Sequence, residues 1–213
     1  MQYAQRRALM VSQQIEKRGV KNAAVLRAMR TVARHLFVAD EFLNVAYDDF
    51  PLPIGFRQTI SQPYIVALMT EQLQLQPHHK VLEIGTGCGY QTAVLAEIAA
   101  KIYSIEIVPE LAARAADNFK RLNYHNIDSK QGDGLSGWQD KAPFDRIMVT
   151  AAPAILPVAL VKQLKIGGCM VIPIGTLLQT LYRIIRKSEN EIEKQILLQV
   201  RFVPMTGEIE NNR

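Results

Sequence analysis

Residues 81–90 read Val-Leu-Glu-Ile-Gly-Thr-Gly-Cys-Gly-Tyr. The mostly apolar residues 81–84 predict a buried strand, and a helix is expected from residue 90 to residue 100. Between them, three glycines at alternate positions let the backbone pass close to a ligand, because glycine has no Cβ. A strand, a glycine loop and a helix in this order predict a cofactor loop. A match of this length, taken alone, also fits a glycine-rich turn that binds nothing.

Strand-like and helix-like segments alternate from this loop onward. Further strands are expected at 102–107, 126–130, 144–150 and 169–174, and further helices at 109–122 and 156–164. Two β-like runs, 180–186 and 195–203, lack a helical pattern between them and predict an antiparallel hairpin. The fold class is therefore α/β: a doubly wound, mostly parallel, Rossmann-like sheet with a C-terminal antiparallel hairpin.

The first 79 residues have a different pattern. Apolar side chains recur at helical spacing over residues 5–17 and 22–29, with Gly19 as the stop between the two helices. Residues 48–55 are expected to form a loop, because Pro51 and Pro53 exclude a helix or a central strand. Another helix is expected to begin at Pro63, with Tyr64, Ile65, Leu68, Met69 and Leu73 on one face. We expect one domain over residues 1–213, with an N-terminal helical and loop region (1–79) and an α/β core (80–213).

Composition restricts the class of protein. The chain has 213 residues, 48% of them hydrophobic, and a net charge of +5 from 25 basic and 20 acidic residues. The basic residues form no dense block, so we expect no nucleic-acid partner. No apolar run is long enough for a membrane span or a signal peptide, and the two cysteines have no disulfide or metal-ligand spacing. No histidine is spaced like a zinc ligand, so no metal site is expected. A monomer in the cytoplasm is the expectation.

Two acidic residues follow later strands of the predicted sheet. Glu106 ends the strand after the glycine loop, 21 residues beyond Gly85, where a carboxylate accepts hydrogen bonds from ribose hydroxyls. Asp133 lies between two glycines after the third strand, where it is placed to accept from an adenine amine. Either acid alone is more often a surface or capping residue. Together with the glycine loop they predict a nucleoside-type cofactor at the carboxyl edge of the sheet.

The spacing of the glycines distinguishes between nucleoside cofactors. Dinucleotide folds favour G-x-G-x-x-G, whereas this loop is G-x-G-x-G and is preceded by Glu83. A carboxylate there repels a diphosphate and suits the positively charged end of S-adenosylmethionine. The alternation and the loop together resemble the class I S-adenosylmethionine-dependent methyltransferases. The residues expected to bind this cofactor are Glu83, Gly85, Thr86, Gly87, Cys88, Gly89, Tyr90, Glu106, Asp133 and Gly134.

A second motif, Pro-Leu-Pro-Ile-Gly-Phe-Arg-Gln-Thr-Ile-Ser-Gln-Pro, occupies residues 51–63. It closely resembles the signature of the protein-L-isoaspartate O-methyltransferases, and the resemblance extends over nearly the whole chain. The resemblance implies transfer of the cofactor's methyl group to the free α-carboxylate of L-isoaspartyl residues in damaged proteins, followed by repair through a succinimide. It also implies that Ser61 is the catalytic residue and that Arg57, Thr59, Ile60, Ser61 and Gln62 bind substrate.

The residues themselves support this chemistry in part. Ser61 precedes the helix expected at Pro63, so its hydroxyl and that helix's N–H groups are suited to hold a carboxylate. The alternative is that Ser61 only caps the helix. A carboxylate of pKa near 4 is already ionised at neutral pH, so the reaction needs no general base, and the chain has no G-x-S-x-G elbow.

The match departs from the family pattern at two positions that matter. Arg57 stands where glycine is common, so it is strained if that position needs a positive φ, and its charge is suited to attract a carboxylate. Cys88 stands where serine is usual and removes a good hydrogen-bond donor from the cofactor loop. Two alternatives stay open: a class I methyltransferase with another substrate, and a cofactor-binding relative without activity.

Overall fold

The computed structural model describes residues 2–207 of the chain. Within that range, seven strands form one sheet in the order β5-β4-β3-β6-β7-β8-β9. The strands are β3 (Lys80–Ile84), β4 (Lys101–Glu106), β5 (Ile127–Gln131), β6 (Phe144–Val149), β7 (Leu164–Ile174), β8 (Gln179–Arg186) and β9 (Ile192–Val200). Strands β5, β4, β3, β6 and β7 are parallel, and β8 is antiparallel to both of its neighbours. The predicted doubly wound sheet with a C-terminal antiparallel hairpin is confirmed.

Strand order reverses between β3 and β6. From β3 the chain proceeds outward through β4 to β5, and it then returns to the other side of β3 to add β6 and β7. In an open parallel sheet, the loops that follow the two central strands separate at this reversal and leave a crevice at their carboxyl ends. The glycine loop follows β3, so the topology places it at the edge of this crevice.

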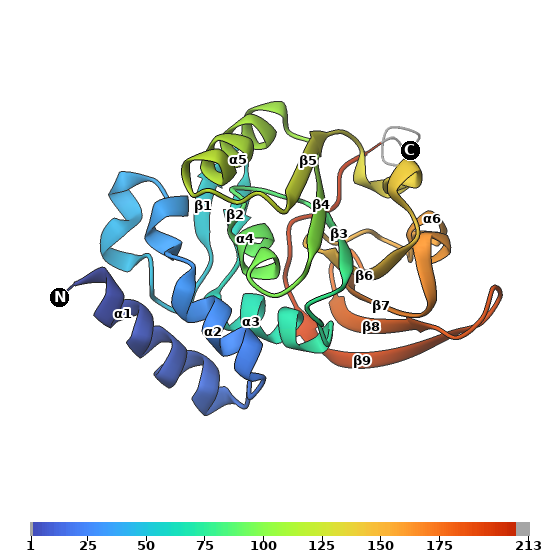
Figure 1. Cartoon of the computed structure of the whole chain (residues 1–213), viewed down its shortest axis with the longest axis horizontal. Helices are drawn as coiled ribbons and strands as arrows, with labels where there is room; N and C mark the ends of the chain where they lie inside the picture. Colours follow the sequence, from blue (N-terminus) through green and yellow to red (C-terminus); the bar gives the residue numbers. More distant parts are fainter. Residues whose placement is uncertain (1, 208–213) are drawn as a thin grey trace.

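Helices pack around the sheet and at one side of it (Figure 1). They are α1 (Tyr3–Leu9), α2 (Ala23–Thr31), α3 (Pro63–Gln72), α4 (Tyr90–Ala96), α5 (Pro109–Arg121) and α6 (Val158–Gln163). A π-helical segment (Met10–Ile15) and a 3-10 turn (Glu16–Arg18) continue α1 without a break. The expected stop at Gly19 is confirmed, since Gly19 adopts a left-handed φ of 96°. Helices α1 and α2 lie at the opposite side of the molecule from the tip of the β8–β9 hairpin (Figure 1).

The N-terminal region shares an apolar cluster with the sheet domain. Buried side chains of Met10, Met29 and Ile60 belong to the same cluster as Tyr90 of α4 and Leu111 of α5. Burial of this apolar surface holds the first 79 residues against the helices that follow the glycine loop. The single domain over residues 1–213 stays a prediction, and residues 1 and 208–213 of it lie outside the described residues.

The structure corrects three details of the sequence interpretation. Residues 52–55, expected as loop, form β1 (Leu52–Gly55), which pairs only with β2 (Gln58–Ile60). Proline is tolerated there because this two-stranded ribbon has free edges that need no donor from Pro53. Helix α4 ends at Ala96 instead of residue 100, and β7 begins at residue 164 instead of 169.

The expected apolar face of α3 was only partly right. Met69 and the following Leu73 are buried as expected, but Tyr64, Ile65 and Leu68 are only partly buried. Val66, Ala67 and Thr70 are buried instead. The reason is that α3 packs against Met10–Ile15, α2 and α4 at once, so more than one face is covered.

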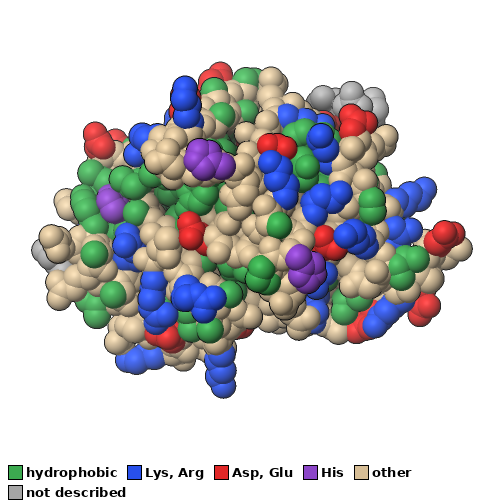
Figure 2. All heavy atoms as spheres, viewed as in Figure 1, with side chains coloured by type: hydrophobic (Ala, Val, Ile, Leu, Met, Phe, Trp, Pro, Cys, Tyr) green, Lys and Arg blue, Asp and Glu red, His purple; other side chains and the backbone are tan. Residues whose placement is uncertain are grey.

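Charge is spread over the surface seen in Figure 2. On this face, Lys and Arg side chains are dispersed among acidic and apolar side chains. Among residues 2–207, none of the helices has the length and the apolar composition needed to cross a membrane.

Candidate functional site

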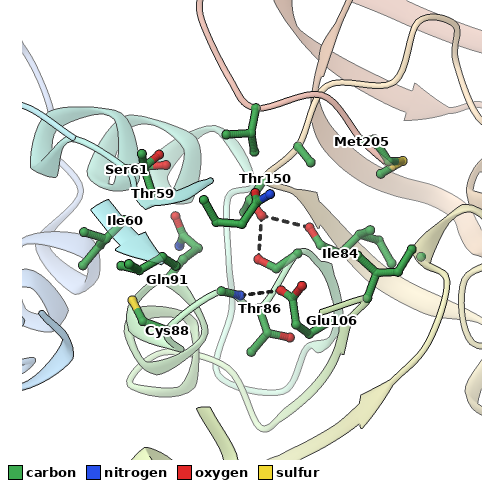
Figure 3. Close-up of a pocket in the computed structure, with 18 of the residues that line it drawn as sticks. Thr59, Ile60, Ser61, Ile84, Thr86, Cys88, Gln91, Glu106, Thr150 and Met205 are labelled. Carbon is green, nitrogen blue, oxygen red and sulfur yellow. Dashed lines mark hydrogen bonds between the residues drawn. The ribbon is translucent and has the colours of Figure 1, made fainter. Parts of the chain in front are cut away.

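An open pocket lies at the carboxyl ends of β3, β4 and β6, where the strand order reverses (Figure 3). The space inside it, counted together with its solvent-filled mouth, is about 820 Å³. Its walls come from four parts of the chain: the β1–β2 hairpin and the residues after it, the glycine loop with the start of α4, the ends of the central strands, and the C-terminal tail. The lining residues are Ile54, Gln58, Thr59, Ile60, Ser61, Val66, Ile84, Gly85, Thr86, Gly87, Cys88, Tyr90, Gln91, Ile105, Glu106, Ile107, Gly134, Thr150, Ala151, Val203, Pro204, Met205 and Thr206.

The glycine loop has the backbone that its sequence predicts. Gly85, Gly87 and Gly89 all have positive φ, at 93°, 56° and 90°. A Cβ on Gly85 would lie 2.3 Å from the Thr150 hydroxyl oxygen, and one on Gly89 would lie 2.6 Å from the Phe119 ring. Side chains are therefore excluded by both backbone conformation and packing. Gly85 and Gly87 line the pocket, whereas Gly89 caps α4 and packs on Phe119.

Glu106 joins the glycine loop to the end of β4. One carboxylate oxygen accepts a hydrogen bond from the Gly87 N–H at 2.7 Å, and the other accepts from the Val108 N–H at 2.9 Å. Only 5% of Glu106 is exposed, yet it lines the pocket. A carboxylate has about four acceptor positions, so two remain to accept from ligand hydroxyls. The structure brings Glu106 and the glycine loop together as the sequence predicts.

Glu83 lies beneath the loop and not in the pocket. Its carboxyl group is completely buried, and one of its oxygens accepts hydrogen bonds from the hydroxyls of Thr92 and Ser104. The Ser104 hydroxyl is in turn 2.6 Å from the Thr86 hydroxyl on the loop. Burial raises the pKa of Glu83 to about 8, so the group is mostly neutral at pH 7. The carboxylate charge that the sequence interpretation placed against the cofactor is therefore largely absent, and Glu83 supports the loop from below.

Asp133 and Gly134 differ in their exposure to the pocket. Gly134 lines it, and a Cβ at that position would lie 2.2 Å from the Ile84 side chain. Asp133 is not among the lining residues, and its carboxylate accepts from the Leu135 N–H at 2.8 Å. An adenine contact by Asp133 stays a prediction.

Cys88 and Tyr90 line the pocket from an apolar environment. Cys88 is 3% exposed and Tyr90 is 1% exposed, and both belong to the apolar cluster shared with the N-terminal helices. Burial raises the pKa of the Cys88 thiol to about 11, so this group is a neutral thiol.

Thr59, Ile60 and Ser61 line the same pocket, across from Glu106 (Figure 3). Two other predicted substrate residues lie elsewhere. Gln62 lines an adjoining hollow that also includes Ser61 and Arg201, and its side-chain amide donates to Asp49. Arg57 is exposed at the tip of the β1–β2 hairpin and does not line the pocket. It has the positive φ, 58°, that makes a non-glycine residue strained there.

The start of α3 differs from the sequence interpretation. Gln62, and not Ser61, is the N-cap residue, and no side chain of the cap bonds to the helix. The Tyr64 N–H donates to the Asp49 carboxylate at 3.2 Å. Part of the helix N-terminus that was expected to hold a substrate carboxylate is thus already occupied by a carboxylate of the chain. The Ser61 side chain is left to face the pocket.

Sequence reasoning missed several lining residues. The Thr150 hydroxyl is 3.0 Å from the Ile84 carbonyl oxygen and 2.6 Å from that of Gly85, to which it donates. Its position directly after a buried strand was a usable signal, because ligand sites lie at strand carboxyl ends. Residues 203–206 had no such signal. They reach the pocket because the tail returns beside β6, where the Ala152 N–H donates to Val203 and the Met205 N–H donates to Ala152.

Comparisons with known proteins agree on one family. The model of the family described as Protein-L-isoaspartate(D-aspartate) O-methyltransferase (PCMT) matches residues 5–210. A Protein-L-isoaspartate O-methyltransferase of Picosynechococcus sp. is 54% identical over 201 residues, which cover 94% of this chain and 90% of that protein. Another with the same name, from Syntrophus aciditrophicus, is 49% identical over 209 residues, with 97% and 96% covered.

Solved structures agree with the sequence comparisons. A Plasmodium falciparum structure described as a protein-L-isoaspartate O-methyltransferase in complex with S-adenosyl-L-homocysteine superposes with a TM-score of 0.82 at 27% identity, covering 94% of this chain and 97% of that one. Sequence match, fold and pocket position therefore lead to one conclusion. The chain belongs to the protein-L-isoaspartate(D-aspartate) O-methyltransferase family, which is a family of class I S-adenosylmethionine-dependent methyltransferases.

Proposed function

We propose that this protein transfers the methyl group of S-adenosylmethionine to the free α-carboxylate of L-isoaspartyl residues in damaged proteins, which starts their repair through a succinimide. One observation carries the proposal: Thr59, Ile60 and Ser61 line the same pocket as the glycine loop and Glu106. A methyl donor and a carboxylate bound by these two sets of residues meet inside one pocket.

The residues of the pocket fit the cofactor. Gly85 and Gly87 present backbone without side chains, and Glu106 keeps acceptor positions that suit ribose hydroxyls. Ile105 and Ile107 add apolar surface on the same side, which suits an adenine ring. When bound, S-adenosylmethionine supplies an electrophilic methyl group whose bond to sulfur breaks as the carboxylate oxygen attacks.

The chain's own residues bind and orient, and they transfer no proton. The substrate carboxylate is already an anion at neutral pH, so a general base is unnecessary. Ser61 donates a hydrogen bond to this anion and holds it at the open side of the glycine loop. Ile60 and Met205 exclude water from the space between the two ligands. The rate then depends on how well the reacting atoms are aligned. Two reactants held together in the right geometry react as if their concentration were very large.

We also propose that the protein acts as a monomer in the cytoplasm. The location in the cytoplasm is supported by the cysteines: Cys88 and Cys169 are both free and buried, as expected for a reducing compartment. Static light scattering of the purified chain tests the first part, and a dimer mass at micromolar concentration contradicts it.

The central experiment uses two peptides that differ only in one linkage. The purified protein is incubated with labelled S-adenosylmethionine and either an isoaspartyl peptide or its normal aspartyl twin, and methyl transfer is measured. We expect transfer to the isoaspartyl peptide alone. Transfer to neither peptide, with cofactor bound, supports the inactive relative, and equal transfer to both supports another substrate.

A pair of serine variants tests the role of Ser61. Ser61→Ala is expected to lower kcat about 10–100-fold while cofactor affinity stays unchanged, because one donor to the reacting carboxylate is lost. Ser188→Ala, in the exposed turn between β8 and β9, is the matched control and is expected to behave as the unaltered protein. Equal kinetics of the two variants would remove Ser61 from the mechanism.

A further inference from the structure

The carboxylate of Asp49 lies where three separate segments meet. One of its oxygens accepts from the Gln62 side-chain amide at 2.7 Å and from the Arg18 guanidinium at 2.5 Å. Its other oxygen accepts from the Tyr64 N–H at 3.2 Å. Asp49 lines neither the main pocket nor the adjoining hollow. It therefore holds the residues on the C-terminal side of Ser61 without entering the site.

Arg18 reinforces the same junction from the N-terminal helices. Besides its ion pair with Asp49, its guanidinium carbon lies 3.4 Å from the centre of the Tyr64 ring. A cation over an aromatic ring is attracted by the ring's electron density. The end of the N-terminal helical segment is thus tied both to Asp49 and to the first turn of α3.

Helix α3 needs this external carboxylate because it has no cap of its own. Its N-cap residue, Gln62, makes no side-chain bond to the helix, and Pro63 has no N–H. The first N–H groups of a helix have no partner within the helix, and a carboxylate near them is stabilising. Asp49 supplies that acceptor from 15 residues away in sequence.

We propose that Asp49 is a positioning residue, which sets the place of Ser61 by fixing both Gln62 and the first turn of α3. This inference rests on the proposed function, in which Ser61 binds the substrate carboxylate. Ser61 is directly bonded to Gln62 in the chain, so its hydroxyl moves when that anchor is lost. The hydrogen bonds of Asp49 go to Arg18, Gln62 and Tyr64, none of which belongs to the glycine loop, so cofactor affinity is expected to stay nearly unchanged when Asp49 is replaced.

The first test compares turnover with cofactor binding. Asp49→Ala is expected to lower kcat/KM for the isoaspartyl peptide about tenfold or more, since a misplacement of about 1 Å is costly in a reaction that depends on alignment. The dissociation constant for S-adenosylhomocysteine, from calorimetry, is expected to stay within about twofold with full stoichiometry, because distant sites behave independently. Asp49→Asn keeps one acceptor oxygen and is expected to lie between Asp49→Ala and the unaltered protein.

A double-mutant cycle separates positioning from general damage. Gln62→Ala is expected to lower kcat/KM alone but to add little in the Asp49→Ala background, because the shared hydrogen bond is already gone. The matched control is Arg30→Ala. It breaks an exposed ion pair with Glu16 at 2.8 Å in the same N-terminal helices but removes none of the bonds that Asp49 makes, and is expected to leave both constants unchanged.

The outcomes distinguish this inference from the proposed function. If the unaltered protein methylates no isoaspartyl peptide, the proposed function fails first. If the unaltered protein is active, three results each overturn the positioning role. They are unchanged kinetics of Asp49→Ala, additive losses of kcat/KM in the double-mutant cycle, and a fall in cofactor stoichiometry as large as the fall in kcat/KM.

Discussion

The two sides of the pocket are built differently. On the cofactor side, Gly85, Gly87 and Glu106 belong to the carboxyl edge of a seven-stranded sheet and are held by partly buried hydrogen bonds. On the substrate side, the β1–β2 hairpin forms its own two-stranded sheet with a turn at Phe56 and Arg57 in the left-handed region. Substitutions on the cofactor side are thus expected to lower stability and cofactor affinity together. Substitutions on the substrate side are expected to lower turnover.

Side chains attach the substrate side to the rest of the molecule. The Arg114 guanidinium on α5 donates to the Ile54 carbonyl oxygen at 2.7 Å, and Asp49 holds the segment after β2. A strand inside a sheet is held by many cooperative backbone bonds, whereas these polar attachments are few and separate and add to the burial of Leu52, Ile54 and Ile60 in the apolar cluster. The comparison between the two sides leads to four predictions.

The largest effect is expected from Gly85→Ala. The new methyl group meets the Thr150 hydroxyl, which is itself bonded to two carbonyl oxygens, and alanine resists a φ of 93°. We expect a loss of about 2–4 kcal/mol in the free energy of unfolding, together with the loss of detectable cofactor binding. Urea unfolding and calorimetry measure the two quantities.

Gly19→Ala is the control for that prediction. Gly19 has a nearly equal φ of 96°, but nothing lies within 4 Å of an added Cβ. It is expected to cost only about 1 kcal/mol and to bind cofactor normally. If both variants lose the same free energy of unfolding, the close packing of Gly85 against Thr150 contributes nothing to stability.

The next effect is expected from Glu106→Gln. The amide is uncharged and keeps one acceptor oxygen in place of two, so both the Gly87 and the Val108 N–H lose a charged partner and one of them loses its acceptor. Cofactor affinity is expected to fall about 10–100-fold, corresponding to about 1.5–3 kcal/mol for a hydrogen bond to a charged group. Glu97→Gln is the control, because the Glu97 carboxylate is exposed and accepts from the Tyr124 hydroxyl. Equal affinities of the two variants would contradict the role of Glu106.

An effect on stability that depends on pH is expected from Glu83→Gln. Burial raises the pKa of Glu83 from 4.5 to about 8, so the folded state keeps a proton that the unfolded state loses. The stability that this proton contributes is complete below pH 4.5 and is lost as the pH rises through about 8. The variant cannot ionise, so its free energy of unfolding is expected to rise relative to that of the unaltered protein across this window.

Urea unfolding of both proteins at about pH 5, 7 and 9 tests this shift. The difference between the two proteins removes the contribution of other groups, such as His79, whose pKa is lowered to about 4 mainly by burial. A difference that does not change with pH would show that Glu83 is ionised in the folded state.

The smallest effect is expected from Arg57→Gly, on the substrate side. Arg57 is exposed and outside the pocket, so its charge acts on a carboxylate substrate only through solvent. KM for the peptide is expected to rise about 2–3-fold at low salt and to return toward normal at high salt, with cofactor affinity unchanged. Arg57→Lys keeps the charge and is expected to keep the KM. Identical KM values in Arg57→Gly and the unaltered protein would rule out the charge role.

Much of the cofactor side follows from local sequence. The strand, the G-x-G-x-G loop and Glu106 are close together along the chain, and their periodicity and spacing are determined by short-range geometry. The same reasoning identified Ser61 and its neighbours only through the resemblance of residues 51–63 to a known family. Of the residues that it placed in the site, Gln62 binds Asp49 and lines the adjoining hollow, Arg57 lies outside the pocket, and substrate binding by either stays a prediction.

The sequence by itself determined the order of strands and helices and the turn at the glycine loop, because these depend on neighbouring residues. Only the tertiary structure decided that Glu83 is buried and mostly neutral, that Asp49 caps α3, and that residues 203–206 close the pocket. Each of these depends on partners distant along the chain. Burial and long-range hydrogen bonds arise when the whole sheet and its helices have packed, and no local pattern encodes them.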